Sequence, residues 1–291
     1  MRFLIPKRHV LALLVMCSWP WAAPVRAADS DATSASSTPA SPQGGFIDTH
    51  VHAFDCRKDG LDVVDAWMKR MNVTQCIIHP LNHPGSRAKT EAERQEMLAN
   101  YRKYQGRIHR FCIIYPDEVK TVEDAVKILE QEKKAGAIGF GEHYGVGLMF
   151  DDPKNLLFYD ACSRVGLPVM FHIDQNKNMD EPGLPRLENV LKAYPKCILI
   201  AHSYWWRQLG NGACERLLQQ YPNLYADLSP AAVAALSKQP DGGREFVIRN
   251  ADKLLFGTDA GWQCTCPQRG AWFYCGGYSD PIPTTSTSTG W

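Results

Sequence analysis

The sequence predicts a (β/α)8 barrel, and three observations support this fold. Eight short apolar runs rich in β-branched and aromatic residues follow one another, about one every 30 residues, the length of a βα unit. Amphipathic helical patterns fill the intervals between the runs. The alternation covers residues 46–259, compared with roughly 250 residues in a typical barrel. An open, doubly wound sheet is the alternative, but it would place a glycine-rich turn after the first strand, where this chain carries the segment 48–52.

The eight runs define the predicted strands, which span residues 45–52, 75–80, 108–116, 137–142, 167–174, 197–202, 223–227 and 253–259. Helices are predicted between them, for example at 89–105, from 121 onward and at 184–194. Thr121 begins the second of these helices, because Asp124 three residues later completes a capping pattern. Apolar residues at helical spacing follow at 122, 125, 126 and 129. Strand and helix patterns therefore agree on a βα repeat.

Composition excludes several classes of protein. A hydrophobic fraction of 45% with 22% charged residues fits a globular core and excludes wholesale disorder, collagen and coiled coil. The 32 Lys and Arg nearly balance the 31 Asp and Glu, so no basic surface for nucleic acid is expected. A small-molecule substrate is the expected partner, and the oligomeric state is left open.

The N-terminal residues 1–27 have the pattern of a secretory signal peptide. Three basic residues precede an uncharged stretch, which ends in the small-x-Ala pattern Val25-Arg26-Ala27. The stretch is shorter than the about 20 residues of a spanning helix, so no stable membrane span is expected. Cleavage would leave 28 basic and 31 acidic residues, a net charge of −3. We expect export to the periplasm or the extracellular space, with residues 28–43 as a flexible leader and 44–262 as the barrel.

The segment 263–291 does not have the apolar period of a helix and contains a Ser/Thr run. We therefore expect an atypical C-terminal tail, with the eighth helix missing or altered, as in a truncated or frame-shifted end. Nine cysteines remain after residue 27, an odd number, so no disulfide framework is indicated.

Histidines and carboxylates stand at the carboxyl ends of several predicted strands. Asp48, His50 and His52 face one side of the first strand, because residues two apart point the same way. The two imidazoles are about 6 to 7 Å apart along the strand, close enough to bind one ion. Four later strands end in Glu142, His172, His202 and Asp259.

A shared metal site explains this pattern. Buried imidazoles and carboxylates are costly unless they are paired or bind a metal, and barrel active sites lie at the carboxyl ends of the strands. The predicted ligands are His50, His52, Glu142, His172, His202 and Asp259.

With these residues the chain resembles the amidohydrolase superfamily, the metal-dependent hydrolase barrels, and within it the amidohydrolase-related branch. The resemblance covers about residues 45–262 and rests on His50-x-His52, His172, His202 and the end of strand eight, Gly257-Thr258-Asp259. In that family the first-strand histidines and the strand-eight aspartate hold one metal. The strand-five and strand-six histidines hold a second metal where there is one.

The resemblance leaves two arrangements open. In binuclear members a strand-four Lys or Glu bridges the metals, and Glu142 matches that position. In mononuclear members similar to aminocarboxymuconate-semialdehyde decarboxylase, His172 joins the first-strand pair and His202 serves as acid/base.

The resemblance implies an enzyme with one or two divalent ions, and zinc is the expected metal. Imidazole and carboxylate ligands suit such a borderline ion, which lowers the pKa of a bound water to about 7 and polarises a carbonyl. Asp259 would accept the proton of this water and pass it to the leaving group. The predicted function is hydrolysis of an amide, lactone or ester in a small molecule. A metal-dependent decarboxylase and a non-catalytic metal-binding barrel are the alternatives.

Other residues near the strand ends allow two interpretations each. Asp227 either contacts substrate or caps the following helix. Tyr204, Trp205 and Trp206 either form an aromatic wall for the substrate or pack against neighbouring helices. Asp48 either accepts a hydrogen bond from a ligand imidazole or bonds to backbone. His143 should face away from Glu142 by alternation, so it is expected either to support the ligands from behind or to stabilise the structure.

Overall fold

A computed structural model describes residues 44–53, 56, 60–80, 88, 90–115, 118–262 and 272–273. Contacts divide the chain into Met1–Gly45 and Phe46–Trp291, and every element described below belongs to the second unit. The predicted signal peptide 1–27 and leader 28–43 lie outside the described residues, as does most of the tail 263–291. No helix in the described ranges combines the length and apolar character needed to cross a membrane.

The strands form one sheet in the order β10-β9-β1-β2-β3-β4-β5-β6-β7-β8. All neighbouring pairs are parallel except β9 and β10. The bounds are β1 (Phe46–Ala53), β2 (Val73–Ile78), β3 (Ile108–Cys112), β4 (Ala137–His143), β5 (Val169–Ile173), β6 (Leu199–Ser203), β7 (Leu224–Asp227), β8 (Leu254–Leu255), β9 (Ala260–Trp262) and β10 (Trp272–Phe273). Each of the eight predicted strands overlaps a strand of this sheet.

The barrel closes through an interrupted eighth strand. β8 pairs with β7, and β9, a few residues further on, pairs with β1. Between them the backbone N–H of Thr49 donates to the carbonyl oxygen of Phe256 at 2.9 Å, and the N–H of Asp259 donates to that of His50 at 2.8 Å. Residues 254–262 therefore run beside both β7 and β1, as the last strand of a (β/α)8 barrel does.

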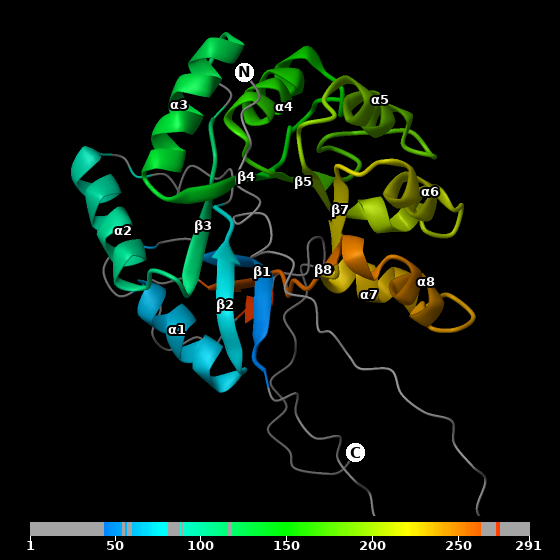
Figure 1. Ribbon diagram of the computed structural model, residues 1–291, viewed down its shortest axis with the longest axis horizontal. Coiled ribbons are helices and arrows are strands. Elements are labelled where there is room, and N and C mark those ends of the chain that lie inside the picture. The colour runs from blue at the N-terminus through cyan, green and yellow to red at the C-terminus, as the bar shows by residue number, and fades with distance from the viewer. Residues whose placement is uncertain are drawn as a thin grey trace, which may run out of the picture. The chain divides into compact units, whose positions relative to one another are not determined.

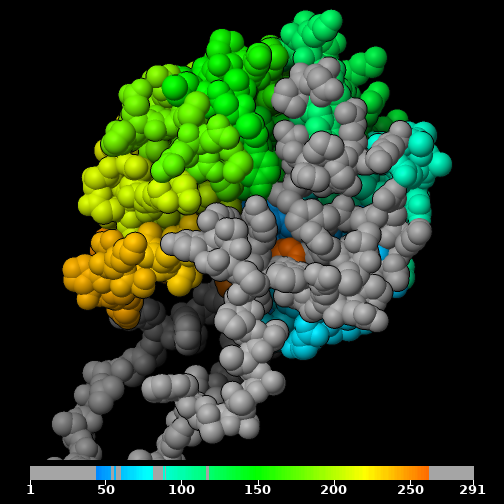
Figure 2. Space-filling model, turned by 180° about the vertical axis from the view of Figure 1, so that it is seen from behind, coloured from blue at the N-terminus to red at the C-terminus, as the bar shows by residue number. Residues whose placement is uncertain are grey.

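The helices follow one another around the strands in chain order (Figure 1). Their bounds are α1 (Gly60–Arg70), α2 (Glu91–Lys103), α3 (Val122–Lys134), α4 (Pro153–Val165), α5 (Pro185–Ala193), η4 (Tyr204–Gln208), α6 (Ala213–Gln220), α7 (Pro230–Leu236), α8 (Arg244–Arg249) and η5 (Ala251–Lys253). From behind, the colours run in the same sequence from one βα unit to the next (Figure 2). Thr121 and Asp124 form the predicted capping box of α3, and Thr90 with Glu93 forms another at α2.

Both α7 and α8 precede β8, so neither is the helix that would follow the eighth strand. Beyond residue 262 the described part of the chain contains only β10, which pairs with β9. In the described part of the chain, the element that follows the eighth strand is thus another strand, whereas a complete barrel has its eighth helix at this point.

The barrel interior is apolar directly below the histidines. Ile77, Phe111, Met170 and Ile200 form a buried cluster. Met170 and Ile200 lie two residues before His172 and His202, so strand alternation turns each apolar and imidazole side chain to the same side. The imidazoles therefore lie above a buried apolar layer.

Candidate metal centre

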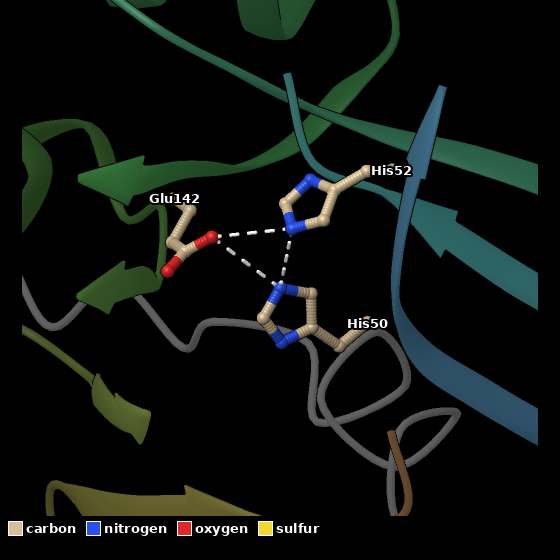
Figure 3. A group of neighbouring side chains, drawn as sticks. All are labelled: His50, His52 and Glu142. Carbon is tan, nitrogen blue, oxygen red and sulfur yellow. Dashed lines mark hydrogen bonds and ion pairs between the residues drawn. The ribbon is translucent and has the colours of Figure 1, made fainter. Parts of the chain in front are cut away.

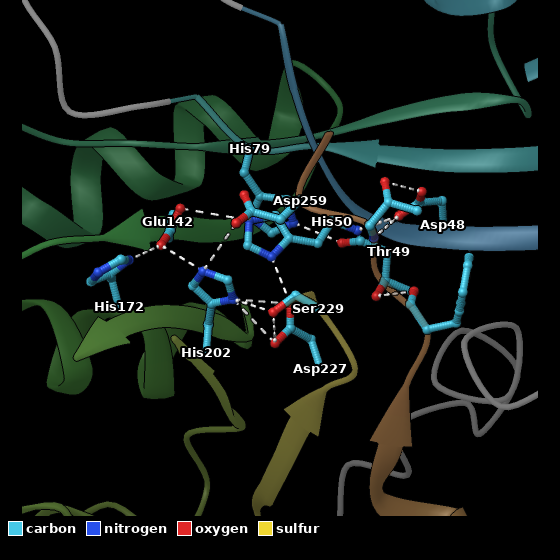
Figure 4. Close-up of polar contacts among 12 residues, drawn as sticks. Asp48, Thr49, His50, His79, Glu142, His172, His202, Asp227, Ser229 and Asp259 are labelled. Carbon is cyan, nitrogen blue, oxygen red and sulfur yellow. Dashed lines mark hydrogen bonds and ion pairs between the residues drawn. The ribbon is translucent and has the colours of Figure 1, made fainter. Parts of the chain in front are cut away.

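The structure brings all six predicted ligands together at the carboxyl ends of β1, β4, β5, β6 and the eighth strand. All except His52 are labelled in Figure 4. Each of the six is less than a tenth exposed. We call His50, His52, Glu142, His172, His202 and Asp259 the ligand cluster.

Glu142 directs its two carboxylate oxygens to two different pairs of histidines. Oε2 lies 3.2 Å from Nε2 of His52 and 3.5 Å from Nε2 of His50, as Figure 3 shows. Oε1 lies 2.5 Å from Nδ1 of His172 and 3.5 Å from Nε2 of His202. Among the described residues, these contacts define two groups whose ligand atoms lie close enough together to hold a metal ion, and the two groups share this one carboxylate.

Asp259 spans the same two groups from the opposite strand. Its Oδ1 lies 3.1 Å from Nε2 of His52 and 3.7 Å from Nε2 of His50. Its Oδ2 lies 3.7 Å from Nε2 of His202. Asp259 has a left-handed φ of 54°, at the point where the chain passes from β8 to β9.

The outward nitrogens of the histidines are all hydrogen-bonded, which fixes the nitrogen that each ring presents to the cluster. Nδ1 of His52 donates to the carbonyl oxygen of His79 at 2.7 Å. Nε2 of His172 lies 3.0 Å from a carboxylate oxygen of Asp174. His52 thus presents Nε2 to the cluster and His172 presents Nδ1, as expected where outer partners orient metal ligands.

Asp227 orients the other two rings. Its Oδ2 lies 2.7 Å from Nδ1 of His50, and both of its oxygens lie 3.1 Å from Nδ1 of His202. Asp227 is fully buried against these rings, and the N-cap of the following helix α7 is Ser229, so neither predicted role, substrate contact or helix cap, describes its position. Gly257 makes room for this arrangement, because a Cβ there would lie 2.8 Å from Cβ of His50.

The donor set fits a divalent cation. Nε2 of His50 and Nε2 of His52 lie 3.1 Å apart, and their lone pairs would repel each other without a cation or proton between them. Burial lowers the pKa of His52, but hydrogen bonds to Asp259 and Glu142 raise it to about 9. Burial likewise opposes ionisation of Glu142, yet the neighbouring His202 and His172 hold its pKa well below the usual value. The cluster thus favours positive charge at its centre, and a metal ion would replace the protons.

Two of the three predicted aromatic contacts are buried. Trp205 and Trp206 are 0% and 1% exposed and belong to the core around the helices. The indole N–H of Trp206 donates to the carbonyl oxygen of Asp227 at 3.0 Å. Both indoles therefore pack against neighbouring elements, which was the second of the two interpretations. The prediction that they form an aromatic wall for the substrate is wrong. Tyr204 is partly exposed, with the guanidinium of Arg207 3.4 Å from the centre of its ring.

Asp48 bonds to backbone and to the eighth strand rather than to a ligand imidazole. Its Oδ1 accepts from the N–H groups of His50 and Thr258, and its Oδ2 accepts from the Thr258 hydroxyl at 2.7 Å. Burial raises the pKa of Asp48. The side chain therefore ties β1 to the closing strand.

His79 and His143, which carry no ligand role in the sequence analysis, are both buried near the cluster. Nε2 of His79 donates to the carbonyl oxygen of Thr49, while burial holds the pKa of His79 well below the usual value. His143 points away from Glu142 toward Asn155, and burial lowers its pKa to about 4. Both rings are neutral at neutral pH.

A barrel with buried His, Glu and Asp donors at its carboxyl ends has the architecture of a metal-dependent enzyme. Residues 47–281 match the family model described as Amidohydrolase, and the chain belongs to this family of enzymes, which includes hydrolases and decarboxylases. No curated protein sequence matches the chain.

Several solved structures are similar to this chain, and one with a TM-score above 0.5 supports the fold. An uncharacterized TIM-barrel protein from Bordetella bronchiseptica is 18% identical, with a TM-score of 0.51 over 74% of this chain and 85% of that one. Dihydroorotase from Campylobacter jejuni is 14% identical, with a TM-score of 0.46 over 74% and 69% of the two chains. 2,6-Dihydroxybenzoate decarboxylase from Rhizobium is 13% identical, with a TM-score of 0.47 over 75% and 88%.

Proposed function

We propose that the protein is a metal-dependent hydrolase that cleaves an amide, lactone or ester bond in a small molecule. One observation carries the proposal: the two oxygens of Glu142 contact two separate histidine pairs. A carboxylate in this position can bridge two ions, the arrangement suited to activating a water between them.

The ligands divide into two sets around Glu142. His50, His52 and Asp259 would hold one ion, and His172 and His202 the other, with zinc as the expected metal because imidazole and carboxylate suit it. Such ions, when bound, lower the pKa of water and polarise a carbonyl.

Asp259 is the proposed proton carrier. Its two oxygens face both histidine groups, and its side chain is 9% exposed, so it adjoins both the cluster and the mouth of the barrel. It would take a proton from the attacking water and deliver it to the leaving group, while Asp227 keeps the rings of His50 and His202 in place.

The test combines metal removal with hydrolysis. Chelation should abolish hydrolysis of a panel of small lactones, cyclic amides and esters, and added zinc should restore it. The panel should include good hydrolase substrates. If the protein with its full metal content hydrolysed none of them, the proposal would be rejected.

A metal-dependent decarboxylase is the second candidate. The observation in its favour is the contact between His202 and the buried carboxylate of Asp227, since a histidine oriented by a carboxylate is a common acid/base. Release of CO2 from carboxylated aromatic compounds by the metal-loaded protein would select this function.

A further inference from the structure

The loop after β4, residues 144–152, and the loop after β5, residues 174–184, are hydrogen-bonded to each other beside the ligand cluster. We call these two loops the wall. The backbone N–H of Gly147 donates to the carbonyl oxygen of Asn176 at 2.7 Å. The buried carboxamide of Asn178 donates to the carbonyl oxygens of His143 and His172, both at 2.8 Å. Side chains on this wall are therefore held in fixed positions relative to the cluster.

Three polar side chains of the wall connect the cluster to its surroundings. The Tyr144 hydroxyl donates to Oε2 of Glu142 at 3.2 Å, and its ring centre lies 4.9 Å from that of His172. Oδ2 of Asp174 lies 3.0 Å from Nε2 of His172 and accepts from Nζ of Lys177 at 2.9 Å. The same Nζ lies 5.1 Å from the centre of the Tyr144 ring. Lys177 thus contacts the two side chains that touch Glu142 and His172.

Lys177 is the basic side chain of this wall, and it is partly open to solvent. It is 31% exposed, whereas Asp174 is 15% exposed. An ammonium carries three donors, and the contact with Asp174 engages one of them. Remaining donors can bind an anion that enters the mouth of the barrel.

We propose that Lys177, supported by the ring of Tyr144, forms a subsite for the carboxylate of an anionic substrate. The inference rests on the proposed function and narrows its substrate class to amides, lactones or esters that carry a free carboxylate. An ammonium held between a carboxylate and an aromatic ring is fixed in position. A substrate carboxylate bound there would place the neighbouring carbonyl toward Glu142 and His172.

A binding experiment tests the subsite directly. Glutarate and glutaramide have the same carbon chain and differ in charge, so calorimetry with the purified full mature chain compares them, with metal content measured on the same sample. Wild type should bind glutarate more tightly, and Lys177→Met should weaken glutarate binding roughly 10- to 100-fold, the usual scale for a charged hydrogen bond. Equal glutarate affinity in wild type and Lys177→Met would overturn the proposal, since the carboxylate would then bind elsewhere.

Lys192→Met is the matched control. Lys192 forms an exposed i,i+4 ion pair with Glu188 on α5, so this variant removes a comparable surface pair away from the wall. Its affinity for glutarate should equal that of wild type. A loss equal to that of Lys177→Met would overturn the subsite.

A kinetic comparison separates recognition from a structural role. 4-Nitrophenyl acetate and mono-4-nitrophenyl glutarate are esters with the same leaving group, one neutral and one anionic. Lys177→Met should lower the anionic-to-neutral ratio of kcat/KM about 10-fold or more, mainly through KM, and Lys177→Arg should keep most of it. An equal fall for both esters would contradict a recognition role. Absence of hydrolysis in a metal-loaded wild type would count against the proposed function, while the glutarate comparison would still decide the subsite.

Discussion

The Nδ1 atom of His50 lies 2.7 Å from Oδ2 of Asp227, and both side chains are fully buried. The same carboxylate contacts Nδ1 of His202 at 3.1 Å. One carboxylate therefore orients two imidazoles that face the two different halves of the ligand cluster. Loss of the Asp227 carboxylate should therefore weaken metal binding by both halves of the ligand cluster.

Asp227→Asn tests this coupling. An asparagine is neutral and has one accepting oxygen, and in either amide orientation its NH2 group faces the donor Nδ1 of His202, so the charge and one accepted hydrogen bond are lost. We expect metal affinity to fall about 10- to 100-fold in competition with a chromogenic chelator. Asp160→Asn, at an exposed ion pair with Arg164 on α4, should leave affinity unchanged. An unaltered affinity in Asp227→Asn would refute the orienting role.

Asp259→Asn separates metal binding from proton transfer. The amide oxygen can still coordinate an ion but cannot take up a proton at neutral pH. The variant should retain some metal while turnover of a confirmed substrate falls roughly 100-fold or more. Turnover at the wild-type rate would show that Asp259 does not carry the proton.

His202→Asn distinguishes the two candidate functions. A fall in bound metal from about two ions to one, measured by elemental analysis, would place His202 in a second metal site and favour the hydrolase. Full metal content with lost turnover would favour the acid/base role of a decarboxylase.

His143 should make stability depend on pH. Burial lowers its pKa to about 4, so the folded state binds fewer protons than the unfolded state between about pH 4 and 6.5. The contribution of His143 to the free energy of unfolding should therefore fall by about 3 kcal/mol as the pH drops through this window and should level off below it. Urea unfolding of the metal-free protein measures this.

His143→Gln supplies the comparison. Because glutamine does not titrate, the stability difference between wild type and variant should shrink from pH 7 to pH 4.5. If the difference in free energy of unfolding between wild type and variant were the same at both pH values, His143 would not be a source of the pH dependence.

We propose that the chain is exported and cleaved after Ala27. The pattern Val25-Arg26-Ala27 predicts a mature N-terminus at or close to Ala28, which N-terminal sequencing of the cellular protein determines. Intact Met1 on most molecules would exclude the signal peptide.

Local pattern was sufficient to predict the strands and the residues that end them. Alternation along β1 places His50 and His52 on one side, and each later ligand follows an apolar run. Each ligand could therefore be predicted from the sequence of its own strand. The partners of the ligands were not predictable in this way. Asp227 meets His50 only because β7 and β1 both border the eighth strand, a relationship that depends on barrel closure.

Burial of Trp205 and Trp206 was equally a tertiary property. The two residues follow His202 directly in sequence, but η4 turns both rings into the core. The position of Lys177 depends on hydrogen bonds between two loops, and no spacing in the sequence indicates them.

The number of metal ions bound by wild type and by Glu142→Ala tests the central claim most directly, because Glu142 is the residue that joins the two halves of the cluster. Elemental analysis of the purified protein should give close to two divalent ions per chain, with zinc expected, and Glu142→Ala should lower that number. A metal-free wild type whose activity survives chelation would contradict the account, as would a Glu142→Ala variant that keeps both ions.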